Sequence, residues 1–430
     1  MKQTPYYVFD TDEFAKRAAM IKAALDCKGG RKIPLCFSIK ANPFLLHRLP
    51  DELDRVEVCS PGELEICIAL GIKPESIIYS GVMKEECDIR RAVEYGAGIL
   101  TCESMRHAGL ISKVVAEFSE ENVLGSESDT GDAKKADCKT AKVILRLTSG
   151  NQFGMSLDDI EYIISHPNEF KGISVIGLHY YSGTQKTLRK INKDLEKIDS
   201  ALTTLKEKYD FESEIVEYGP GLCVEYFEDG WEAKEQAALE EAAEVLRQFA
   251  GKYPLGIEMG RFLAASCGKY YTKVMDLKST GDANYAILDG GIHHLNYYGQ
   301  RMAMQVPPIR IYADGYELCE NNGENSKIKG VAGPVGDIEN IENTGNNMDY
   351  TLCGSLCTVA DVLVREVTLP KLEPGDILEF GHCGAYSVTE APALFLSRHM
   401  PAIYAYSKDN GYECLREHIP AAEINLAKKV

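Results

Sequence analysis

The sequence predicts an α/β protein in which a closed parallel (β/α)8 barrel, a TIM barrel, is combined with a C-terminal antiparallel β domain. Eight short apolar runs, each typical of a buried strand, alternate with amphipathic segments of helical period over about 230 residues. Beyond about Lys278 the helical period is lost, and β-branched, alternating runs follow one another. The chain of 430 residues is long enough for two or three domains.

The elements of the predicted barrel follow from hydrophobic periodicity and turn signals. The eight strand-like runs are Leu35–Ala41, Val56–Ser60, Ile77–Gly81, Ile99–Ser104, Lys142–Thr148, Val175–Tyr181, Glu214–Gly221 and Leu255–Arg261. Amphipathic helices are expected between them, among them Gly62–Leu70, Lys84–Tyr95, Leu157–His166, Leu188–Tyr209 and Ala233–Phe249. The second run ends where Ser60 and Glu63 have the spacing of a capping box, and Pro61 suits the first helical position.

The second domain is predicted from short runs separated by turn signals. Its strands are expected at Tyr285–Asp289, Ile309–Tyr312, Tyr350–Leu352, Val362–Leu369, Asp376–Phe380 and Ala402–Tyr406, joined by the N-terminal strand Tyr6–Phe9. The barrel then occupies residues 20–278, and the β-rich domain occupies residues 1–19 and 279–430. Two stretches, 119–141 and 320–349, have compositions typical of surface insertions.

The composition argues against several classes of function. A formal charge of −18, with no offsetting cluster of Lys and Arg, disfavours nucleic acid and anionic membranes as partners. No apolar stretch is long enough to span a bilayer, and the start of the chain lacks the pattern of a signal peptide. The 14 cysteines have no paired short spacing, so we expect free thiols, no metal site and a cytoplasmic protein that acts on a small molecule.

Lys40 is the first candidate functional residue. It ends the apolar run that begins at Leu35 and precedes Asn42-Pro43, where Asn42 can cap a helix that starts at Pro43. A desolvated lysine with a lowered pKa is a good nucleophile toward carbonyls. For a lone lysine, a side chain that extends into water is the commoner explanation, so its surroundings decide between the two.

Those surroundings are the carboxyl ends of the predicted strands, where enzymes of this fold place their sites. The polar and glycine residues at these ends are Lys40, Ser60, Glu103, Arg146, His179, Tyr181, Gly219, Gly221, Glu258, Gly260 and Arg261. The loops after strands seven and eight commonly bind phosphate, which suits the three glycines and Arg261. Without the barrel context, a Gly-x-Gly segment is more often a tight turn than a phosphate site.

Five motifs, in chain order, then carry a family resemblance. They are Phe37-Ser38-Ile39-Lys40-Ala41-Asn42, Gly177-Leu178-His179, Glu258-Met259-Gly260-Arg261, Leu356-Cys357 and Gly384-Ala385-Tyr386. Together they resemble the fold-type III pyridoxal-phosphate-dependent decarboxylases, an alanine racemase-like barrel family that includes the diaminopimelate, ornithine and arginine decarboxylases. The resemblance extends from Tyr6 to Tyr406.

The resemblance implies that Lys40 holds pyridoxal 5'-phosphate as a Schiff base and that Glu258 faces the pyridine nitrogen. The other cofactor-binding residues that it implies are Ser60, His179, Tyr181, Gly219, Gly221, Gly260, Arg261 and Tyr386. Cys357 corresponds to a catalytic cysteine that protonates the product and comes from the other subunit, which implies a homodimer with shared sites. Arg146, Thr358 and Asp361 are the expected substrate-binding residues.

Two departures from the family pattern bear on the substrate. The family usually has His-x-His-Ile-Gly-Ser on the sixth strand, whereas this chain has His179-Tyr180-Tyr181-Ser182-Gly183-Thr184, so Tyr181 takes the place of the stacking histidine. After Cys357 the family carries carboxylates suited to a distal ammonium, whereas this chain has Thr358. The predicted function is therefore α-decarboxylation like that of diaminopimelate decarboxylase, on an amino acid or amino-acid-like substrate whose distal group is unassigned, including free and carrier-linked substrates of secondary pathways.

Three alternatives remain open at the level of the sequence. One is an amino-acid racemase of the same fold, against which Glu258 argues because such racemases have arginine at the ring nitrogen. Another is a non-catalytic regulatory homologue, against which the complete cofactor set around Lys40 argues. The third is a cofactor-binding protein without a substrate, which usually consists of the barrel alone.

Overall fold

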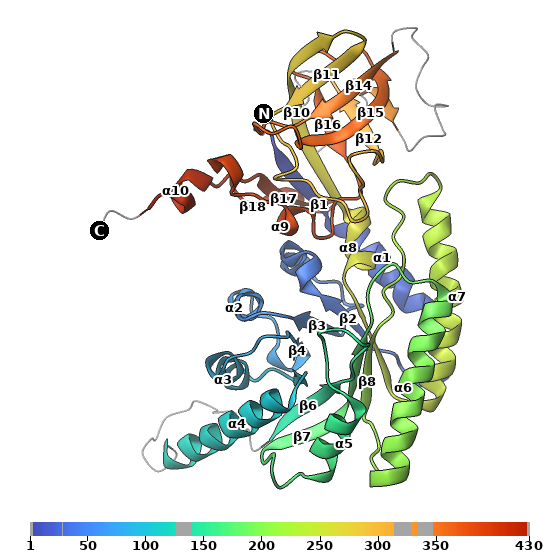
Figure 1. The fold of residues 1–430 in the computed structure, drawn as a ribbon, viewed down its shortest axis with the longest axis vertical. Helices are drawn as coiled ribbons and strands as arrows, with labels where there is room; N and C mark the ends of the chain where they lie inside the picture. Colours follow the sequence, from blue (N-terminus) through green and yellow to red (C-terminus); the bar gives the residue numbers. More distant parts are fainter. Residues whose placement is uncertain (1–2, 28, 126–139, 314–327, 333–346, 428–430) are drawn as a thin grey trace. The chain divides into compact units, whose positions relative to one another are not determined.

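The computed structural model describes residues 3–27, 29–125, 140–313, 328–332 and 347–427, and the chain divides into two compact units (Figure 1). The barrel unit comprises residues 18–223 and 236–262. The sheet unit comprises residues 1–17, 224–235 and 263–430. The barrel unit thus ends at residue 262, before the boundary predicted at 278, because residues 268–280 form a strand of the sheet unit.

Eight parallel strands form the closed barrel, as the sequence predicted, and they pair in chain order. The strands are β2 (Leu35–Ser38), β3 (Arg55–Val58), β4 (Ile77–Tyr79), β5 (Ile99–Cys102), β6 (Ala141–Arg146), β7 (Ile173–Tyr181), β8 (Ile215–Gly219) and β9 (Leu255–Met259). The barrel closes where β2 pairs with β9, which brings Cys36 beside Glu258. Most strands end two or more residues before the predicted runs do, because the last residues of those runs already belong to the loops.

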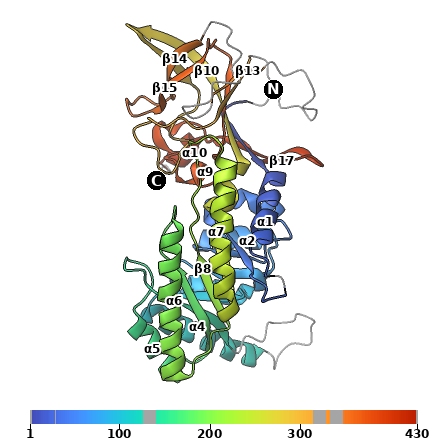
Figure 2. The same ribbon diagram turned by 90° about the vertical axis from the view of Figure 1, so that its right-hand side faces the viewer.

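Helices connect these strands. They are α2 (Pro61–Ala69), α3 (Glu86–Tyr95), α4 (Met105–Gly125), α5 (Leu157–Ser165), α6 (Leu188–Tyr209) and α7 (Trp231–Lys252), preceded by α1 (Thr11–Ala24), with short 3-10 turns η1 (Ile39–Ala41), η2 (Pro43–Arg48) and η3 (Pro74–Ser76). Figure 2 shows α6 and α7, each of 22 residues, lying lengthwise outside the strands. The bounds predicted for α6 are confirmed.

The barrel interior is apolar in one layer and polar nearer the carboxyl ends of the strands. The apolar layer is formed by Cys36, Ile78, Ile99, Ile144, Ile176 and Ile215, all of them buried. Glycine lets two strands approach at one point, because a Cβ added to Gly177 of β7 would overlap the carbonyl oxygen of Ile215 on β8. The polar layer contains Glu57, His179, Glu217 and Glu258. A packed interior with a polar layer at one end is where a barrel enzyme places its chemistry.

The sheet unit is built on a ten-stranded sheet. Its strands are β1 (Tyr6–Asp10), β10 (Gly268–Thr280), β11 (Ala283–Leu288), β12 (Ile309–Tyr312), β13 (Ile328–Ala332), β14 (Asn347–Cys353), β15 (Val362–Pro370), β16 (Ile377–Phe380), β17 (Ala402–Ser407) and β18 (Gly411–Arg416). The predicted N-terminal strand joins it, since β1 pairs with β10 and β17. The sheet is mixed rather than wholly antiparallel, because the β1–β17 and β11–β14 pairs are parallel.

Five further helical segments are short: α8 (Arg261–Ala264), η4 (Ala265–Cys267), α9 (Ser387–Glu390), η5 (Phe395–Ser397) and α10 (Ala421–Asn425). The two predicted insertions are only partly described. Residues 119–125 continue helix α4, and residues 126–139 lie outside the described part of the chain. Within the stretch 320–349, residues 328–332 form β13 and 347–349 begin β14, so these parts are strands rather than loop; the other residues of this stretch lie outside the described part.

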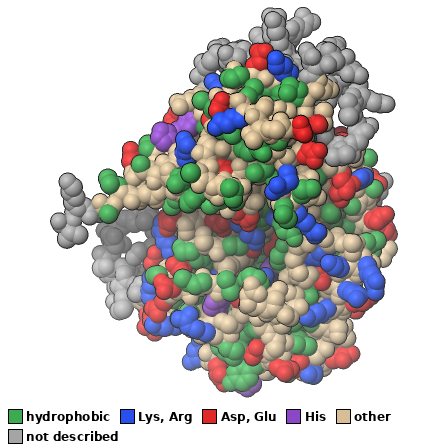
Figure 3. Space-filling view, turned by 45° about the horizontal axis from the view of Figure 1, so that its top comes forward, with side chains coloured by type: hydrophobic (Ala, Val, Ile, Leu, Met, Phe, Trp, Pro, Cys, Tyr) green, Lys and Arg blue, Asp and Glu red, His purple; other side chains and the backbone are tan. Residues whose placement is uncertain are grey.

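The surface carries both signs of charge, and acidic, basic and hydrophobic side chains are interspersed on the face seen in Figure 3. The 12 cysteines in the described part of the chain are all free thiols. Among the described helices, none combines the length and the apolar character needed to cross a membrane.

Candidate active site

Lys40 lies one short turn beyond β2, in η1, rather than at the last position of the strand. The turn is followed by η2, whose first residue is Pro43 and whose N-cap is Asn42. The Asn42 side chain accepts a hydrogen bond from the backbone N–H of Phe44 at 3.1 Å, which confirms the predicted cap, although the helix is of the 3-10 type. Two consecutive turns therefore fix the backbone on both sides of Lys40.

The Lys40 ammonium contacts two side chains of β3 and of the loop after it. Its Nζ lies 3.1 Å from Oε2 of Glu57 and 3.5 Å from Sγ of Cys59. Burial would raise the pKa of Glu57, but the positive charge of Lys40, followed by that of His179, holds this pKa below its ordinary value. Glu57 is therefore a buried carboxylate anion paired with Lys40, and β3 with the loop after it brings two side chains to the lysine.

Tyr181, at the end of β7, brings an aromatic ring to the same place. Lys40 Nζ lies 6.0 Å from the centre of the Tyr181 ring, at the limit of a cation–π contact. Burial raises the pKa of the Tyr181 phenol, the nearby charges of Lys40 and Arg261 lower it, and Glu258 and Glu57 raise it. The phenol thus stays neutral among charged groups.

Glu258 and His179 form a second buried pair in the barrel. His179 Nε2 lies 3.1 Å from Oε2 of Glu258, and both side chains are almost completely buried. The other ring nitrogen of His179, Nδ1, has no hydrogen-bond partner in the described part of the chain. Histidine thus orients the Glu258 carboxylate and leaves one ring nitrogen unused.

The predicted glycines fit closely against these residues. A Cβ added to Gly219 would lie 2.5 Å from Cδ2 of Tyr181 and 2.8 Å from Oε1 of Glu258, so only glycine lets both side chains reach their places. Gly221 has a φ of +58°, which favours glycine. Gly260 leads into α8, which begins at Arg261.

Ser60, which was predicted to bind the cofactor, is the N-cap residue of helix α2. Its Oγ accepts a hydrogen bond from the backbone N–H of Glu63 at 3.2 Å and caps α2, with Pro61 as the first helical residue. The Glu63 carboxylate accepts from the backbone N–H of Cys59 at 2.6 Å instead of from that of Ser60. The cap therefore fixes the loop that presents Cys59 to Lys40.

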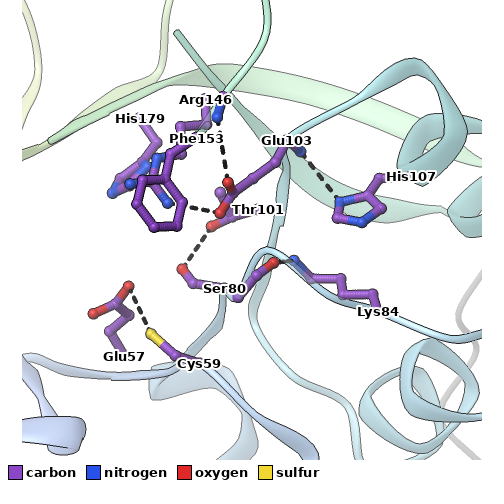
Figure 4. Close-up of polar contacts among 12 residues, drawn as sticks. Glu57, Cys59, Ser80, Lys84, Thr101, Glu103, His107, Arg146, Phe153 and His179 are labelled. Atoms are coloured by element: carbon purple, nitrogen blue, oxygen red, sulfur yellow. Dashed lines mark hydrogen bonds and ion pairs between the residues drawn. The ribbon is translucent and has the colours of Figure 1, made fainter. Parts of the chain in front are cut away.

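A second polar cluster lies at the ends of β4, β5 and β6 (Figure 4). Arg146 Nη1 lies 2.7 Å from Oε1 of Glu103, and the guanidinium is 4.8 Å from the centre of the Phe153 ring. The backbone N–H of Gly154 donates to Oε2 of Glu103 at 3.3 Å. Arg146, a predicted substrate residue, is thus already paired with Glu103 and stacked on an aromatic ring.

Lys84 completes this second cluster from the loop after β4. Its ammonium is buried, donates to the carbonyl oxygen of Gly81 and lies 5.7 Å from the centre of the Tyr79 ring. Burial lowers the pKa of Lys84 to about 8, although the Glu103 carboxylate opposes this shift. Lys84 is therefore a lysine of lowered basicity in the same barrel.

Four predicted site residues belong to the sheet unit. Cys357 and Thr358 are exposed, in the turn between β14 and β15. Asp361 is buried, and its carboxylate accepts hydrogen bonds from the backbone N–H groups of Ile292 at 2.8 Å and Leu356 at 2.7 Å. Tyr386, with a φ of +67°, precedes α9.

The barrel unit therefore brings together the predicted residues Lys40, His179, Tyr181, Gly219 and Glu258. It also adds residues that the sequence analysis did not single out: Glu57, Cys59, Lys84, Phe153, Lys186 and Asp194. The signal for Glu57 is the alternation along β3, where an acidic residue stands between the apolar Val56 and Val58.

The geometry fits a cofactor that carries an aldehyde, a pyridine nitrogen and a phosphate. Such a group needs an amine, an acidic partner for the ring nitrogen and close backbone donors for the phosphate. The barrel offers an amine in Lys40, an acidic group in Glu258 and closely approachable backbone in the Gly219–Gly221 turn. In addition, Nδ1 of His179 is a buried polar atom without a hydrogen-bond partner in the described part of the chain. A closed barrel with this set at one end defines the class of cofactor-dependent barrel enzymes.

The chain belongs to the pyridoxal-dependent decarboxylases: the family model "Pyridoxal-dependent decarboxylase, pyridoxal binding domain" matches residues 11–265. It is 24% identical to the L-glutamyl-[BtrI acyl-carrier protein] decarboxylase of Niallia circulans, over 98% of this chain and 93% of that protein. It is 25% identical to the diaminopimelate decarboxylase of Zymomonas mobilis, over 91% of this chain and 85% of that protein.

Solved structures agree on the fold. The diaminopimelate decarboxylase of M. jannaschii in complex with L-lysine matches with a TM-score of 0.74 at 21% identity, covering 98% of this chain and 91% of that one. The predicted family, fold, cofactor and reaction class are confirmed: the chain is an enzyme that uses pyridoxal phosphate for decarboxylation. The relatives differ in the substrate that their names give.

Proposed function

We propose that this enzyme removes the α-carboxylate of an amino-acid substrate that has no distal ammonium, with Lys40 as the residue that binds the cofactor aldehyde. The observation that carries this proposal is that two ion pairs, the half-buried Lys40–Glu57 pair and the buried His179–Glu258 pair, lie beside the ring of Tyr181. One pair contains the amine and the other contains an oriented carboxylate. These are the two groups that pyridoxal chemistry requires from the protein.

Glu57 positions Lys40 for its role. Oε2 of Glu57 is anionic and lies 3.1 Å from Lys40 Nζ, so it anchors the ammonium near the end of the barrel. Because the lysine charge lowers the pKa of Glu57, this carboxylate is a weak base, and the proton that Lys40 must lose before it attacks a carbonyl goes to another acceptor. The pair also holds the lysine side chain in one orientation.

Glu258 would face the ring nitrogen and keep it protonated, while His179 holds the carboxylate in place at 3.1 Å. When bound, pyridoxal phosphate supplies an electron sink for the electron pair left behind by the departing carbon dioxide. Tyr181 would cover one face of the ring. Unlike histidine, it cannot become a cation there.

The turn after β8, the residues after β9 and Tyr386 are proposed to hold the phosphate. Gly219, Gly221 and Gly260 allow the backbone to approach closely, and Arg261 supplies charge-assisted donors. Pro220, between the two glycines of β8 and its loop, has no N–H to contribute.

The substrate's distal group is proposed to meet Thr358, which is uncharged and exposed. Asp361 was expected to bind substrate, but its buried carboxylate is engaged by two backbone N–H groups, which supports a positioning role for the segment that carries Cys357 and Thr358. Without a carboxylate at residue 358, a distal ammonium gains no ion pair. A glutamyl substrate, free or linked to a carrier, is therefore favoured over diaminopimelate or ornithine.

The thiol of Cys357 is proposed to donate the proton that takes the place of the lost carboxylate, in a homodimer whose sites are completed by the partner subunit. Its exposure in the sheet unit supports this role, since a cysteine serving another subunit has to stand at the surface. We place the enzyme in the cytoplasm, which suits the 12 free thiols of the described chain.

The test is a decarboxylation assay with the enzyme loaded with pyridoxal phosphate. Carbon dioxide release is measured with glutamate, a glutamyl-loaded acyl carrier protein, ornithine, lysine and meso-diaminopimelate. We expect a glutamyl substrate to react at least about tenfold faster, by kcat/KM, than any of the three diamino acids, about the difference that one lost ion pair makes. Efficient turnover of meso-diaminopimelate would refute the proposed role of Thr358.

A further inference from the structure

Lys186 is a second buried lysine of the barrel unit, and nothing in the function proposed above uses it. It lies in the loop after β7, just before α6, and only 2% of its side chain is exposed. Taking an ammonium out of water is costly unless charged and polar partners surround it. The partners of Lys186 therefore indicate what its burial achieves.

Its ammonium has two hydrogen-bond partners that come from different elements. Nζ lies 2.7 Å from Oδ2 of Asp194 on α6 and 2.9 Å from the carbonyl oxygen of Gly219 at the end of β8. The same nitrogen lies 5.4 Å from the ring centre of Tyr181 and 5.1 Å from that of Tyr218. One cation thus contacts both the aromatic ring and the glycine turn.

Asp194 forms further hydrogen bonds with the residues next to Tyr181 and Gly219 in the chain. Its carboxylate accepts hydrogen bonds from Ser182, which follows Tyr181, at 2.8 and 2.9 Å, and from the hydroxyl of Tyr218, which precedes Gly219, at 3.0 Å. Asp194 is itself buried. The ion pair of Lys186 and Asp194 therefore connects the end of β7 to the end of β8: Asp194 contacts residues of both, and Lys186 contacts Gly219.

The backbone reinforces the connection. The N–H of Lys186 donates to the carbonyl oxygen of Gly221 at 2.9 Å, so the loop after β7 runs beside the loop after β8. A Cβ on Gly221 would lie 2.8 Å from Cε of Lys186, which means that the lysine stem fills the space beneath this turn. A substitution of the lysine side chain would thus alter the packing against Gly221 and remove the hydrogen bond to the carbonyl oxygen of Gly219.

We infer that Lys186, through its ion pair with Asp194, is a positioning residue that fixes the ring of Tyr181 and the Gly219–Gly221 turn relative to one another and thereby sets the affinity for pyridoxal phosphate. The inference rests on the proposed function of Tyr181 and these glycines as cofactor-binding residues. It assigns to Lys186 no contact with the cofactor or the substrate.

The test compares Lys186→Met with Lys190→Met, a matched control in which the same change is made at an exposed lysine of α6. The dissociation constant of pyridoxal phosphate is measured by titrating the visible absorption of the bound cofactor, and that of inorganic phosphate is measured by calorimetry on the cofactor-free protein. We expect Lys186→Met to weaken cofactor binding by at least about tenfold, as the loss of a charge-assisted hydrogen bond does. Lys190→Met should bind like the parent protein.

The double variant Lys186→Met/Asp194→Asn separates positioning from simple structural support. Removing both charges should restore much of the thermal stability lost in Lys186→Met, because no uncompensated buried charge remains. We expect the cofactor to stay at least about tenfold weaker in the double variant, because the Nζ contacts to Gly219 and Tyr181 are still missing.

Two results would overturn the inference. One is parent-like cofactor affinity in Lys186→Met. The other is cofactor affinity that returns together with stability in the double variant, because Lys186 would then act only through the stability of the fold. Failure of the parent protein itself to bind pyridoxal phosphate would instead refute the proposed function, so the two outcomes are distinguishable.

Discussion

Lys40, Lys84 and Lys186 of the barrel unit have buried or half-buried side chains, and their contacts differ. Lys84, whose pKa is lowered to about 8 by burial, donates to a backbone carbonyl. Lys186 is paired with Asp194. Lys40 pairs with Glu57 and has the most exposed side chain of the three, at 36%. A nucleophile has to be reachable as well as activated, which favours Lys40 over the more deeply buried Lys84.

Replacing Lys40 with alanine should therefore abolish the visible absorption of the bound cofactor and reduce turnover by several orders of magnitude, because no other amine takes its place. Lys84→Met serves as the control and should keep the absorption. The measurement is a spectrum of each protein after incubation with pyridoxal phosphate and removal of the excess. An unchanged spectrum in Lys40→Ala would contradict the central assignment.

Cys357→Ala should leave cofactor binding unchanged and lower kcat by about 100-fold, since the loss of a positioned proton donor typically costs that much. The matched control is Cys414→Ala, which removes another exposed thiol of the sheet unit. Steady-state rates and cofactor titrations of both variants give the comparison. Equal effects of the two substitutions would argue against a specific role for Cys357.

Glu217 makes stability depend on pH in a definite direction. Burial raises the pKa of this carboxyl to about 8; the charge of Arg55 opposes the shift, while Glu258 and Glu57 add to it. The folded protein therefore binds a proton that the unfolded chain releases near pH 4.5, and this stabilisation is lost as the pH rises through about 8.

The free energy of unfolding of the parent protein should fall between pH 5 and pH 8.5. In Glu217→Gln this fall should be smaller by at least about 1 kcal/mol, because glutamine does not titrate. Urea unfolding of the parent and the variant across that range measures it, with Glu214→Gln, an exposed neighbour, as the control. A variant that loses as much stability as the parent over this range would rule the effect out.

For single residues, the sequence predicts which ones belong to a functional motif, but it does not predict which side chains contact them in the folded protein. Lys40 and Glu258 could be predicted because each stands in a recognisable segment at a strand end. Glu57 and Lys186 could not, since each is defined by proximity to residues far away in the sequence. Asp361 lies within a recognisable motif, yet only its backbone donors reveal that the carboxylate is already engaged.

Among the elements, β7 and β8 depend on one glycine for their pairing. An alanine at Gly177 would place its methyl group into the carbonyl oxygen of Ile215, so the strands could pair only after a backbone shift. We expect Gly177→Ala to destabilise the protein by about 3 kcal/mol, at the upper end for overpacked sites. Gly109→Ala is the control: this glycine lies in α4 with nothing near its added Cβ, and alanine should stabilise the helix by about 1 kcal/mol.

Chemical denaturation of the two variants measures both changes. Equal stabilities would mean that the strands tolerate the methyl group and that the close approach is not required.

The elements themselves were predictable to different degrees. The barrel could be predicted because each strand is an apolar run and each helix carries its own period, so α6 was placed to the residue. The sheet unit was harder. Strand β10 has buried residues in its first half and mostly exposed residues in its second half, and such a run has no single pattern. The parallel pairing of β1 with β17 joins the two ends of the chain, and no local signal reports it.

On the scale of the whole molecule, the proposed dimer makes a prediction about mixtures. If each site combines one subunit's barrel with the partner's Cys357, a hybrid of Lys40→Ala and Cys357→Ala chains has both defects in one site and an intact second site. Equal mixing gives half hybrids, so activity should recover to about 25% of the parent value.

The control mixture combines Lys40→Ala with Glu258→Gln, which damages the barrel of both chains and should recover nothing. Subunits are exchanged by mild denaturation and refolding, and sedimentation reports the assembly. Hybrids that form but stay inactive in the first mixture would exclude shared sites.

The position of β1 in the sheet determines when the sheet unit can fold during synthesis of the chain. Every strand of the barrel has been synthesised once the ribosome passes residue 262, so this unit can close early. Strand β1, although it precedes the barrel strands in the chain, has to wait for β10 and finally for β17, which is completed only at Ser407. During that interval an apolar strand with unpaired N–H and C=O groups is open to wrong partners. Until β17 has been made, β1 is thus a segment that a chaperone would protect.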